Sequence, residues 1–391
     1  MTCKLRTVAI FMVVFLSACV FTYGIDYSYH GYASQQYLKT TGNNYLADDS
    51  KDGSFEFNEI GLNLSASFTD SIRGGFQLLS RDFGEAGNND LKLDWGFVEY
   101  KPLDQIGISA GKIKLPFGLY NKSRDVDMIR TPITLPQSVY LEDLRDVLVA
   151  FTGVSVHGFL FDQLMYEVYK GNAEVDDDIP FFVDLISGLF PFVVSGLETE
   201  VTDQVGGALT WFTPLDGLRA GISYVEADLE FDLDWGLIPF PITKVNFEVR
   251  DWFVYSLEYS YEDLTIAAEL SQMEYTFIIP GVGSSTMDLQ GYYVQADYRI
   301  NELVELGTYY SVYYSHTGDK SGKRFSAVGQ PDYKAWMKDW ALYARFDIKD
   351  WWIVKVEYHT MDGATLPYDM WNPTGLKEDW ETFSIKTSFN F

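Results

Sequence analysis

The chain ends with WETFSIKTSFNF, residues 380–391, in which polar and apolar side chains alternate. Successive side chains of a β-strand point to opposite faces, so this segment has one apolar face and one polar face. The apolar face carries Phe383, Ile385, Thr387, Phe389 and Phe391, and the polar face carries Thr382, Ser384, Lys386, Ser388 and Asn390. The sequence therefore predicts a two-faced strand that continues to the last residue and ends on phenylalanine.

The other end of the chain has the features of a secretion signal. Lys4 and Arg6 precede an apolar run over residues 8–21, and cleavage after Gly24 would leave residues 25–391 as the mature protein. An alternative is a lipoprotein-type signal processed at Cys19, because residues 16–19 read LSAC. Both cysteines of the chain lie in residues 1–24, so a mature chain that starts at residue 25 would hold together without disulfides.

A secretion signal together with a closing strand that ends on an aromatic residue indicates a bacterial outer-membrane β-barrel. The closing strand resembles the C-terminal signature by which such barrels are recognised for insertion. Aromatic residues make up 17% and hydrophobic residues 47% of the chain. No uninterrupted apolar run beyond the signal approaches the ~20 residues that a membrane helix needs. Abundant Tyr and Trp suit the aromatic girdles of a barrel, although a secreted β-sandwich or propeller also has short alternating strands.

The net charge of the chain limits the classes of molecule that it can bind. The formal net charge is −27, which argues against nucleic acid because phosphates need a basic surface. Acidic clusters at 48–49, 176–178 and 228–234 are predicted to lie in loops. They would either concentrate cations at a pore mouth or only keep exposed loops soluble.

Alternating segments continue along the whole mature chain, without a linker or a shift in composition, which predicts one domain. Short and long connections alternate between them, as in outer-membrane barrels with short periplasmic turns and long extracellular loops. An even number of strands leaves both termini in the periplasm, and closure removes the sheet edges that lipid does not tolerate. We predict an all-β, antiparallel up-and-down transmembrane barrel of about sixteen strands, at 26–38, 54–68, 72–82, 92–101, 106–114, 147–158, 164–171, 201–213, 218–228, 251–262, 264–275, 288–299, 304–316, 336–347, 351–363 and 380–391.

The two faces of these strands predict which side chains meet lipid and which meet water. In 251–262, for example, Phe253, Tyr255 and Leu257 alternate with Ser256 and Glu258. We expect the apolar rows to face outward and the ionic rows to face the lumen. A barrel of sixteen strands is too wide for side chains to fill, so it encloses an aqueous channel.

The longest connection without a strand pattern runs from Leu115 to Arg145 and is the third extracellular loop of this arrangement. Loops of such length inside one domain are usually functional. Basic and acidic side chains are interleaved along it.

Here the sequence resembles the Gram-negative porins. The resemblance is carried by GKIKLPFGLYN at 111–121, RDVD at 124–127 and LPQ at 135–137, with HGY at 30–32 and FEFNEIGL at 55–62 upstream. It implies a sixteen-stranded barrel, commonly a homotrimer, whose third loop (115–145) folds into the lumen and narrows it. Opposed charges at such a narrow point set ion selectivity. By this resemblance the pore-constriction candidates are Lys112, Lys114, Lys122, Arg124, Asp125, Asp127 and Arg130.

Further charged residues are expected to line the lumen: Arg73, Arg81, Arg345, Lys355, Glu357 and Lys386. The phosphate-selective porins, which this chain resembles more loosely, use a ladder of arginines. No such ladder can be traced here, because acidic residues share the same inward faces: Glu59, Glu258, Glu269, Asp297 and Glu305. The interleaved loop charges would alternatively only hold the loop down through Arg–Asp pairs.

The sequence offers little for catalysis. None of the four histidines has metal-ligand spacing with a cysteine or a second histidine, so no metal site and no cofactor is expected. His359, beside Glu357 and Lys355, is interpreted as a polar lining residue. The apolar stretch 181–197 is unusual for a loop tip. It would be a latch into a neighbouring subunit, a segment folded over the barrel mouth, a path for apolar substrate or a strand pair above the membrane.

These observations predict an outer-membrane porin for passive diffusion of small hydrophilic solutes or ions, with membrane lipid and neighbouring subunits as its contacts. The alternatives are an outer-membrane barrel enzyme of the phospholipase type and a surface barrel that forms no channel.

Overall fold

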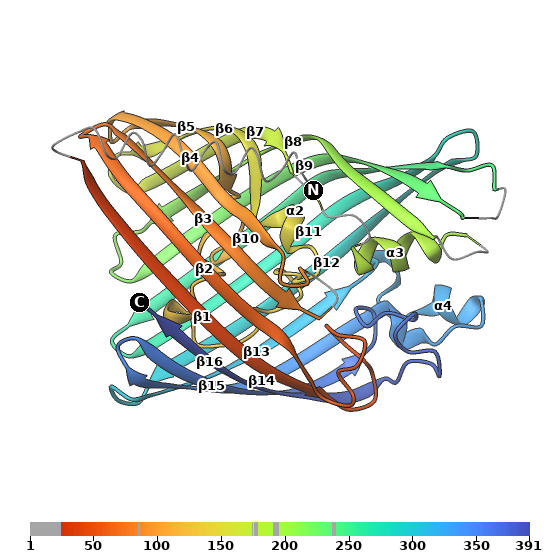
Figure 1. Cartoon of the computed structure of the whole chain (residues 1–391). Helices are drawn as coiled ribbons and strands as arrows, with labels where there is room; N and C mark the ends of the chain where they lie inside the picture. The colour runs from red at the N-terminus through yellow and green to blue at the C-terminus, as the bar shows by residue number, and fades with distance from the viewer. Residues whose placement is uncertain (1–24, 85–86, 174, 176–178, 191–194, 237–239) are drawn as a thin grey trace.

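The computed structural model describes residues 25–84, 87–173, 175, 179–190, 195–236 and 240–391. Sixteen antiparallel strands form one closed barrel in which each strand pairs with its neighbours in the sequence and β1 pairs with β16 (Figure 1). The predicted barrel, its strand number and its antiparallel order are confirmed. The predicted signal, residues 1–24, lies outside the described residues.

Most strands, above all β8 to β12, are longer than the sequence pattern predicted, mainly at the ends that carry long loops, whereas β6 begins later and β13 ends earlier than predicted. Their bounds are β1 Asp26–Thr40, β2 Ser54–Thr69, β3 Ile72–Phe83, β4 Leu91–Leu103, β5 Ile106–Lys114, β6 Ala150–Leu160, β7 Leu164–Asn172, β8 Gly196–Phe212, β9 Leu218–Asp234, β10 Lys244–Tyr261, β11 Leu264–Ile279, β12 Gly283–Arg299, β13 Val304–Tyr314, β14 Trp336–Lys349, β15 Trp352–Gly363 and β16 Asp379–Asn390. No helix among the described residues is long and apolar enough to cross a membrane.

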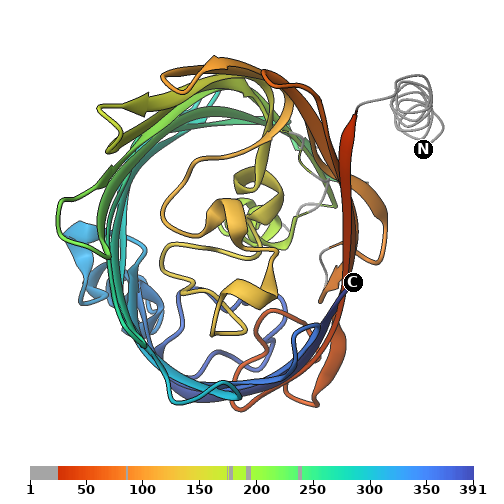
Figure 2. The ribbon, with the colours of Figure 1, turned by 90° about the vertical axis from the view of Figure 1, so that its left-hand side faces the viewer.

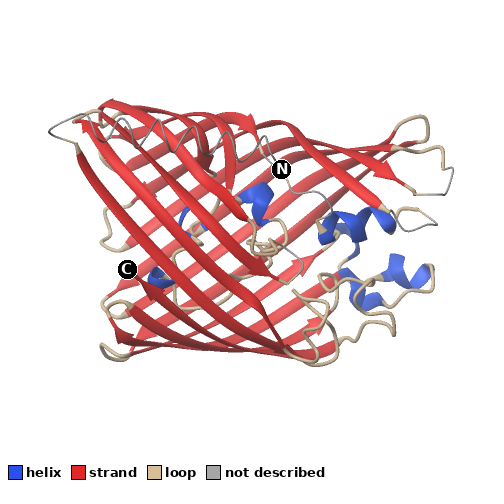
Figure 3. Cartoon of the chain, in the orientation of Figure 1, coloured by secondary structure: helices blue, strands red, loops and turns tan. Residues whose placement is uncertain are grey.

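Short turns join the strands at one end of the barrel, the turn end, and longer loops join most of them at the other, the loop end (Figure 3). The helices α3 (Pro180–Ser187) and α4 (Lys323–Ala327) lie at the loop end. At the turn end, Phe391 exchanges both backbone hydrogen bonds with Gly31, at 2.8 and 2.9 Å. The last residue of the chain therefore extends the pairing between β1 and β16.

The predicted alternation of faces is confirmed over much of the barrel. On β14, the outward side chains of Trp340 and Leu342 are 58% and 55% exposed, whereas the inward side chain of Asp339 on the same strand is 2% exposed. On β16, Phe383 and Ile385 are exposed and Lys386 is buried. An apolar outer surface of this kind suits contact with lipid, and the polar rows face the interior.

At the loop end of β8 to β12 the alternation is reversed. Leu229, Phe231 and Leu233 of β9 are buried inside the barrel, while Glu230 and Asp232 between them are exposed outside. The prediction that residues 228–234 form an acidic loop is therefore wrong, because they belong to a strand. The outward row becomes acidic where this part of the barrel extends past the apolar band, since its outer surface there meets water.

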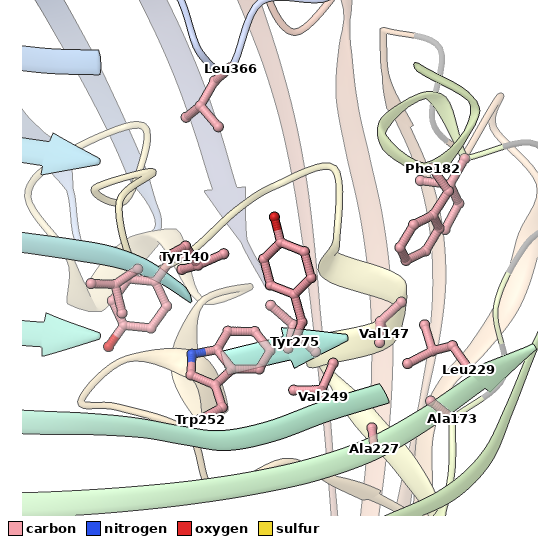
Figure 4. Close-up of a cluster of buried hydrophobic side chains, with 14 of the residues drawn as sticks. Tyr140, Val147, Ala173, Phe182, Ala227, Leu229, Val249, Trp252, Tyr275 and Leu366 are labelled. Atoms are coloured by element: carbon pink, nitrogen blue, oxygen red, sulfur yellow. The ribbon is translucent and has the colours of Figure 1, made fainter. Parts of the chain in front are cut away.

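The inward apolar residues of this extension form a hydrophobic core inside the barrel. Figure 4 shows Ala227, Leu229 and Val249 on the strands, with Val147 and Phe182 approaching from interior segments. Phe182 belongs to α3 and packs on Phe231 with ring centroids 5.0 Å apart. Of the alternatives for residues 181–197, the described part fits a segment folded over the barrel mouth.

We expect Phe231→Ala to destabilise the protein by about 3–5 kcal/mol, because it removes a fully buried ring and leaves a cavity. The neighbouring outward substitution Glu230→Ala is the control and should cost no more than about 0.5 kcal/mol. Urea unfolding in detergent micelles, followed by tryptophan fluorescence, measures both. Equal costs for the two variants would contradict the reversed alternation.

Candidate constriction site

Residues 115–149, which we call the inner loop, leave the wall after β5 and cross the interior of the barrel before β6 begins. Figure 2 shows them in yellow and orange within the ring of strands. The inner loop contains two 3₁₀ turns, η1 (Asn121–Ser123) and η2 (Asp127–Ile129), and the short helix α2 (Arg145–Leu148). Its predicted position in the lumen is confirmed. The Asn121 side chain joins its two legs by donating to the carbonyls of Leu115 and Leu148, at 3.0 and 2.6 Å.

Asp127 anchors the inner loop to the strands that close the barrel. Its carboxylate lies 2.7 Å from Lys386 Nζ, 2.8 Å from Arg130 Nη2 and 3.8 Å from Lys355 Nζ. The Ser388 hydroxyl donates a further hydrogen bond at 2.8 Å. Burial alone would raise the pKa of Asp127, but the surrounding cations hold that pKa well below its usual range. The carboxylate is therefore ionised and compensated.

The tip of the inner loop is held by a second carboxylate of the wall. Glu357 on β15 accepts the backbone N–H groups of Ile133 and Thr134, at 2.6 and 3.1 Å. Nearby, the Thr131 hydroxyl donates to Glu305 at 2.7 Å. These bonds fix the backbone of the tip and not only its side chains.

A third carboxylate, Glu269 on β11, holds the inner loop from the opposite wall. It accepts the backbone N–H of Leu119 at 2.8 Å and the hydroxyl of Tyr140. The hydroxyls of Tyr293 and Ser256, on neighbouring strands, also donate to it. The inner loop is thus attached on both sides of the lumen by hydrogen bonds to buried carboxylates of the wall.

Within the inner loop and beside it, opposite charges are paired closely. Arg124 lies 2.8 Å from Glu142, and Arg81 on β3 lies 3.7 Å from the same carboxylate. Although burial opposes the effect, these guanidinium groups lower the pKa of Glu142 to about 2. Lys114 lies 2.6 Å from Asp125, which also accepts from Gln77 on β3.

A pocket lies between the inner loop and the wall formed by β16, β1, β2 and β3. Its lining carries four basic and four acidic side chains: Arg124, Arg130, Arg145 and Lys386, and Glu59, Asp82, Asp125 and Glu142. The hydrophobic core packs inside the loop end of β8 to β12 and also reaches the wall of the pocket, where Phe57 of β2 belongs to both. The pocket lies against the wall, so it is displaced to one side of the barrel axis.

Residues 364–378, which we call the roof loop, connect the inner loop to other loops at the loop end. The Tyr368 hydroxyl donates to Asp143 of the inner loop. Asn372 and Asn44 exchange hydrogen bonds of 2.8 and 3.0 Å, which join the roof loop to the first long loop. Asp369 pairs with Lys334 at 2.7 Å. The roof loop thus fixes three other loops relative to one another.

Asp143 gives this contact a pH dependence. Burial raises the pKa of Asp143 to about 6, with Glu142 adding to the rise and Tyr368 opposing it. A carboxyl whose pKa is raised on folding contributes most below its unfolded pKa of ~3.9, and that contribution is lost as pH rises through about 6. We expect Asp143→Asn to raise stability at pH 8 by up to about 3 kcal/mol and to change it little at pH 4.

The urea-unfolding midpoint at the two pH values measures this effect. Asp216→Asn, in an exposed turn, is the control and should shift the midpoint equally at pH 4 and pH 8. A midpoint for Asp143→Asn that is equally shifted at both pH values would contradict the assignment.

The structure brings together most of the residues that the sequence nominated. Lys114, Arg124, Asp125, Asp127 and Arg130 lie within the network described above. Lys122 pairs instead with Glu167 on β7. Lys112 is not among the residues that line the pocket.

The six expected lumen residues all lie on inner faces of strands, but at different positions along the barrel axis. Arg81, Lys355, Glu357 and Lys386 reach the inner loop or its partners. Arg345 reaches Asp347 and, at 3.5 Å, the Arg130 carbonyl. Arg73 lies near the turn end, paired with Glu99 at 2.6 Å.

Sequence reasoning did not single out Glu142, Arg145, Asp94 and Gln77 as site residues. Glu142 and Arg145 were visible as part of the interleaved charges of the loop. Gln77 lies on the inner face of β3, and Asp94, 2.9 Å from Arg145, is turned inward by a β-bulge at the pairing of β3 and β4, which strict alternation does not predict. Their distance from the loop was not predictable, since it depends on strand tilt and register.

No protein-family model and no curated protein matches this sequence. Solved structures do match over nearly the whole chain. The OmpF of Salmonella typhi in complex with daunomycin superposes with a TM-score of 0.59 at 12% identity, covering 94% of this chain and 98% of that one. This chain has the fold of an outer-membrane porin.

Two further porin folds match similarly. OmpT of Vibrio cholerae gives a TM-score of 0.57 at 13% identity, covering 95% of this chain and 99% of that one. An anion-selective porin from Comamonas acidovorans gives 0.56 at 11% identity, covering 94% and 100%. At these identities the likeness concerns the porin fold, and function is argued from the site.

Proposed function

We propose that the protein is a passive channel of the Gram-negative outer membrane for small hydrophilic solutes or ions. The observation that carries the proposal is the polar pocket between the inner loop and β16 to β3, with charges of both signs on each of its two sides. The porin fold and the exposed apolar outer surface support a location in the outer membrane. No bond has to be made or broken for this function.

The geometry supports a narrow path that is displaced from the barrel axis. The pocket lies between the inner loop and the wall formed by β16, β1, β2 and β3, away from the barrel axis. Solutes would therefore pass beside Arg124, Asp125 and Glu142, where the charges are balanced. We expect a small conductance with weak selectivity between simple cations and anions, because width and field together set selectivity.

We also propose that the channel works as a homotrimer. One of the matched structures, OmpT of Vibrio cholerae folded in vitro, is described as a trimer form and gives a TM-score of 0.55 at 14% identity. Light scattering of the detergent-solubilised protein tests this proposal. A mass of one chain after subtraction of bound detergent would contradict it.

Recordings in planar lipid bilayers test the channel function itself. We expect stepwise, ohmic current increments on insertion of the folded protein, and a small reversal potential in a salt gradient. Folded protein that inserts without conductance would favour a barrel that forms no channel. Release of fatty acid from phospholipid without conductance would favour a barrel enzyme.

A further inference from the structure

A buried chain of charged side chains lies in the wall behind the tip of the inner loop. His359 on β15 lies between Asp339 on β14 and Glu357 on its own strand. Its Nδ1 is 2.9 Å from an Asp339 oxygen, and its Nε2 is 2.8 Å from a Glu357 oxygen. The three side chains are no more than 5% exposed. Both ring nitrogens face acceptors, and only a cationic imidazole donates from both.

The chain of contacts ends on the path proposed above. At one end, the Tyr309 hydroxyl donates to Asp339 at 3.1 Å. At the other, Glu357 accepts the backbone N–H groups of Ile133 and Thr134, and both of these residues line the pocket. His359 does not line the pocket itself, but Glu357 connects it to the backbone of Ile133 and Thr134, which do.

Charge balance gives His359 its role. Two buried carboxylates that contact the same side chain are costly unless a cation compensates them. The nearest lysine on the same strand, Lys355, is engaged elsewhere, because its Nζ donates to the carbonyls of Asp127 and Pro132 at 2.9 and 3.1 Å. His359 is the cation that contacts both Asp339 and Glu357.

We propose that His359 is a positioning residue for the constriction. As a cation between two carboxylates it holds the side chain of Glu357 in place, and Glu357 fixes residues 133–134 at the side of the path. The consequence for current rests on the proposed function. The restraint that Glu357 places on the tip of the inner loop does not depend on the proposed function, so it can be tested separately.

The test uses Thr134→Cys as a reporter in the full chain. Modification of the cysteine by a water-soluble charged maleimide is followed by mass spectrometry of the peptide that contains residue 134, which needs no conductance. In the His359→Gln background we expect modification to be at least roughly tenfold faster, because hydrogen bonds to charged groups stabilise by about that factor or more. The current should also become noisier.

A compensating variant separates a charge role from simple packing. In Asp339→Asn with His359→Gln, Tyr309 donates to the asparagine oxygen, the asparagine amide donates to the glutamine oxygen and the glutamine amide donates to Glu357. We expect this double variant to restore the slow modification. A side chain that only fills space would not be rescued by a change at Asp339.

His157→Gln is the matched control. His157 also faces a lumen carboxylate, Glu99 at 3.0 Å, but lies on β6 near the turn end, and we expect its variant to leave the rate unchanged. An unchanged rate in His359→Gln, or a fast rate in the double variant, would overturn the proposal. If the single variant His359→Gln fails to fold, the double variant decides. A double variant that folds and is modified slowly supports the proposal, and a double variant that also fails to fold overturns it. Wild-type protein without conductance would refute only the channel function.

Discussion

Asp127→Ala should lower the free energy of unfolding by about 3–5 kcal/mol, because removal of one partner leaves buried cations uncompensated. Lys386, Arg130 and Lys355 all lie within 3.8 Å of this carboxylate. Lys386 keeps Glu59 at 3.1 Å, but Lys355 keeps only carbonyl partners. We also expect the reversal potential in a potassium chloride gradient to shift toward anions, since Arg130 and Lys386, which line the pocket, lose a compensating negative charge.

Asp127→Asn separates the two effects, because it keeps the shape of the side chain and removes only its charge. The control is Asp203→Ala, whose pair with Lys170 at 3.0 Å has both side chains more than half exposed. Such a pair contributes about 0–1 kcal/mol, so this variant should unfold almost like the wild type. If Asp127→Ala matched the Asp203 variant in both unfolding and reversal potential, the anchoring role of Asp127 would be refuted.

The parity of side chains on the strands was predictable from sequence, and so was the existence of the inner loop. The alternation in 380–391 and 336–347 correctly placed Lys386 and Asp339 inside and Phe383 and Trp340 outside. One rule failed: apolar rows were expected to face outward everywhere. At the loop end of β8 to β12 they face inward, because the protein supplies an apolar surface of its own in the inner loop and α3.

The composition of the site was only partly predictable. The alternation along a strand shows which face a side chain is on, but not its position along the barrel axis. Lys112 and Lys114 share a parity, yet Lys114, the last residue of β5, reaches Asp125 while Lys112 is not among the residues that line the pocket. Asp127 and Lys386 are 259 positions apart in the numbering, and their contact requires barrel closure between β1 and β16. His359 looked like an ordinary lining residue because its partner Asp339 lies on the adjacent strand.

The second large effect is expected at Glu269, the anchor on the opposite wall. Glu269→Ala removes the acceptor of four donors: the hydroxyls of Tyr140, Tyr293 and Ser256 and the backbone N–H of Leu119. A buried donor left without an acceptor costs about 1–3 kcal/mol, and water entering the space left by the side chain satisfies only some of them. We therefore expect a loss of at least about 3 kcal/mol in the free energy of unfolding.

The same substitution should also change the current. Tyr140 both donates to Glu269 and accepts the Tyr120 backbone N–H at 3.0 Å, so loss of the carboxylate loosens both legs of the inner loop. We expect larger current fluctuations in bilayer recordings, with a smaller effect for Glu269→Gln, which retains one acceptor oxygen. Glu274→Ala, five residues along β11 and exposed outside the barrel, is the control and should change stability by less than about 0.5 kcal/mol. A Glu269→Ala protein that unfolds like the control yet conducts without added noise would show that Asp127 and Glu357 suffice to hold the loop. The two walls would then be unequal partners, and the width of the path would be set from the side of the closing strands alone.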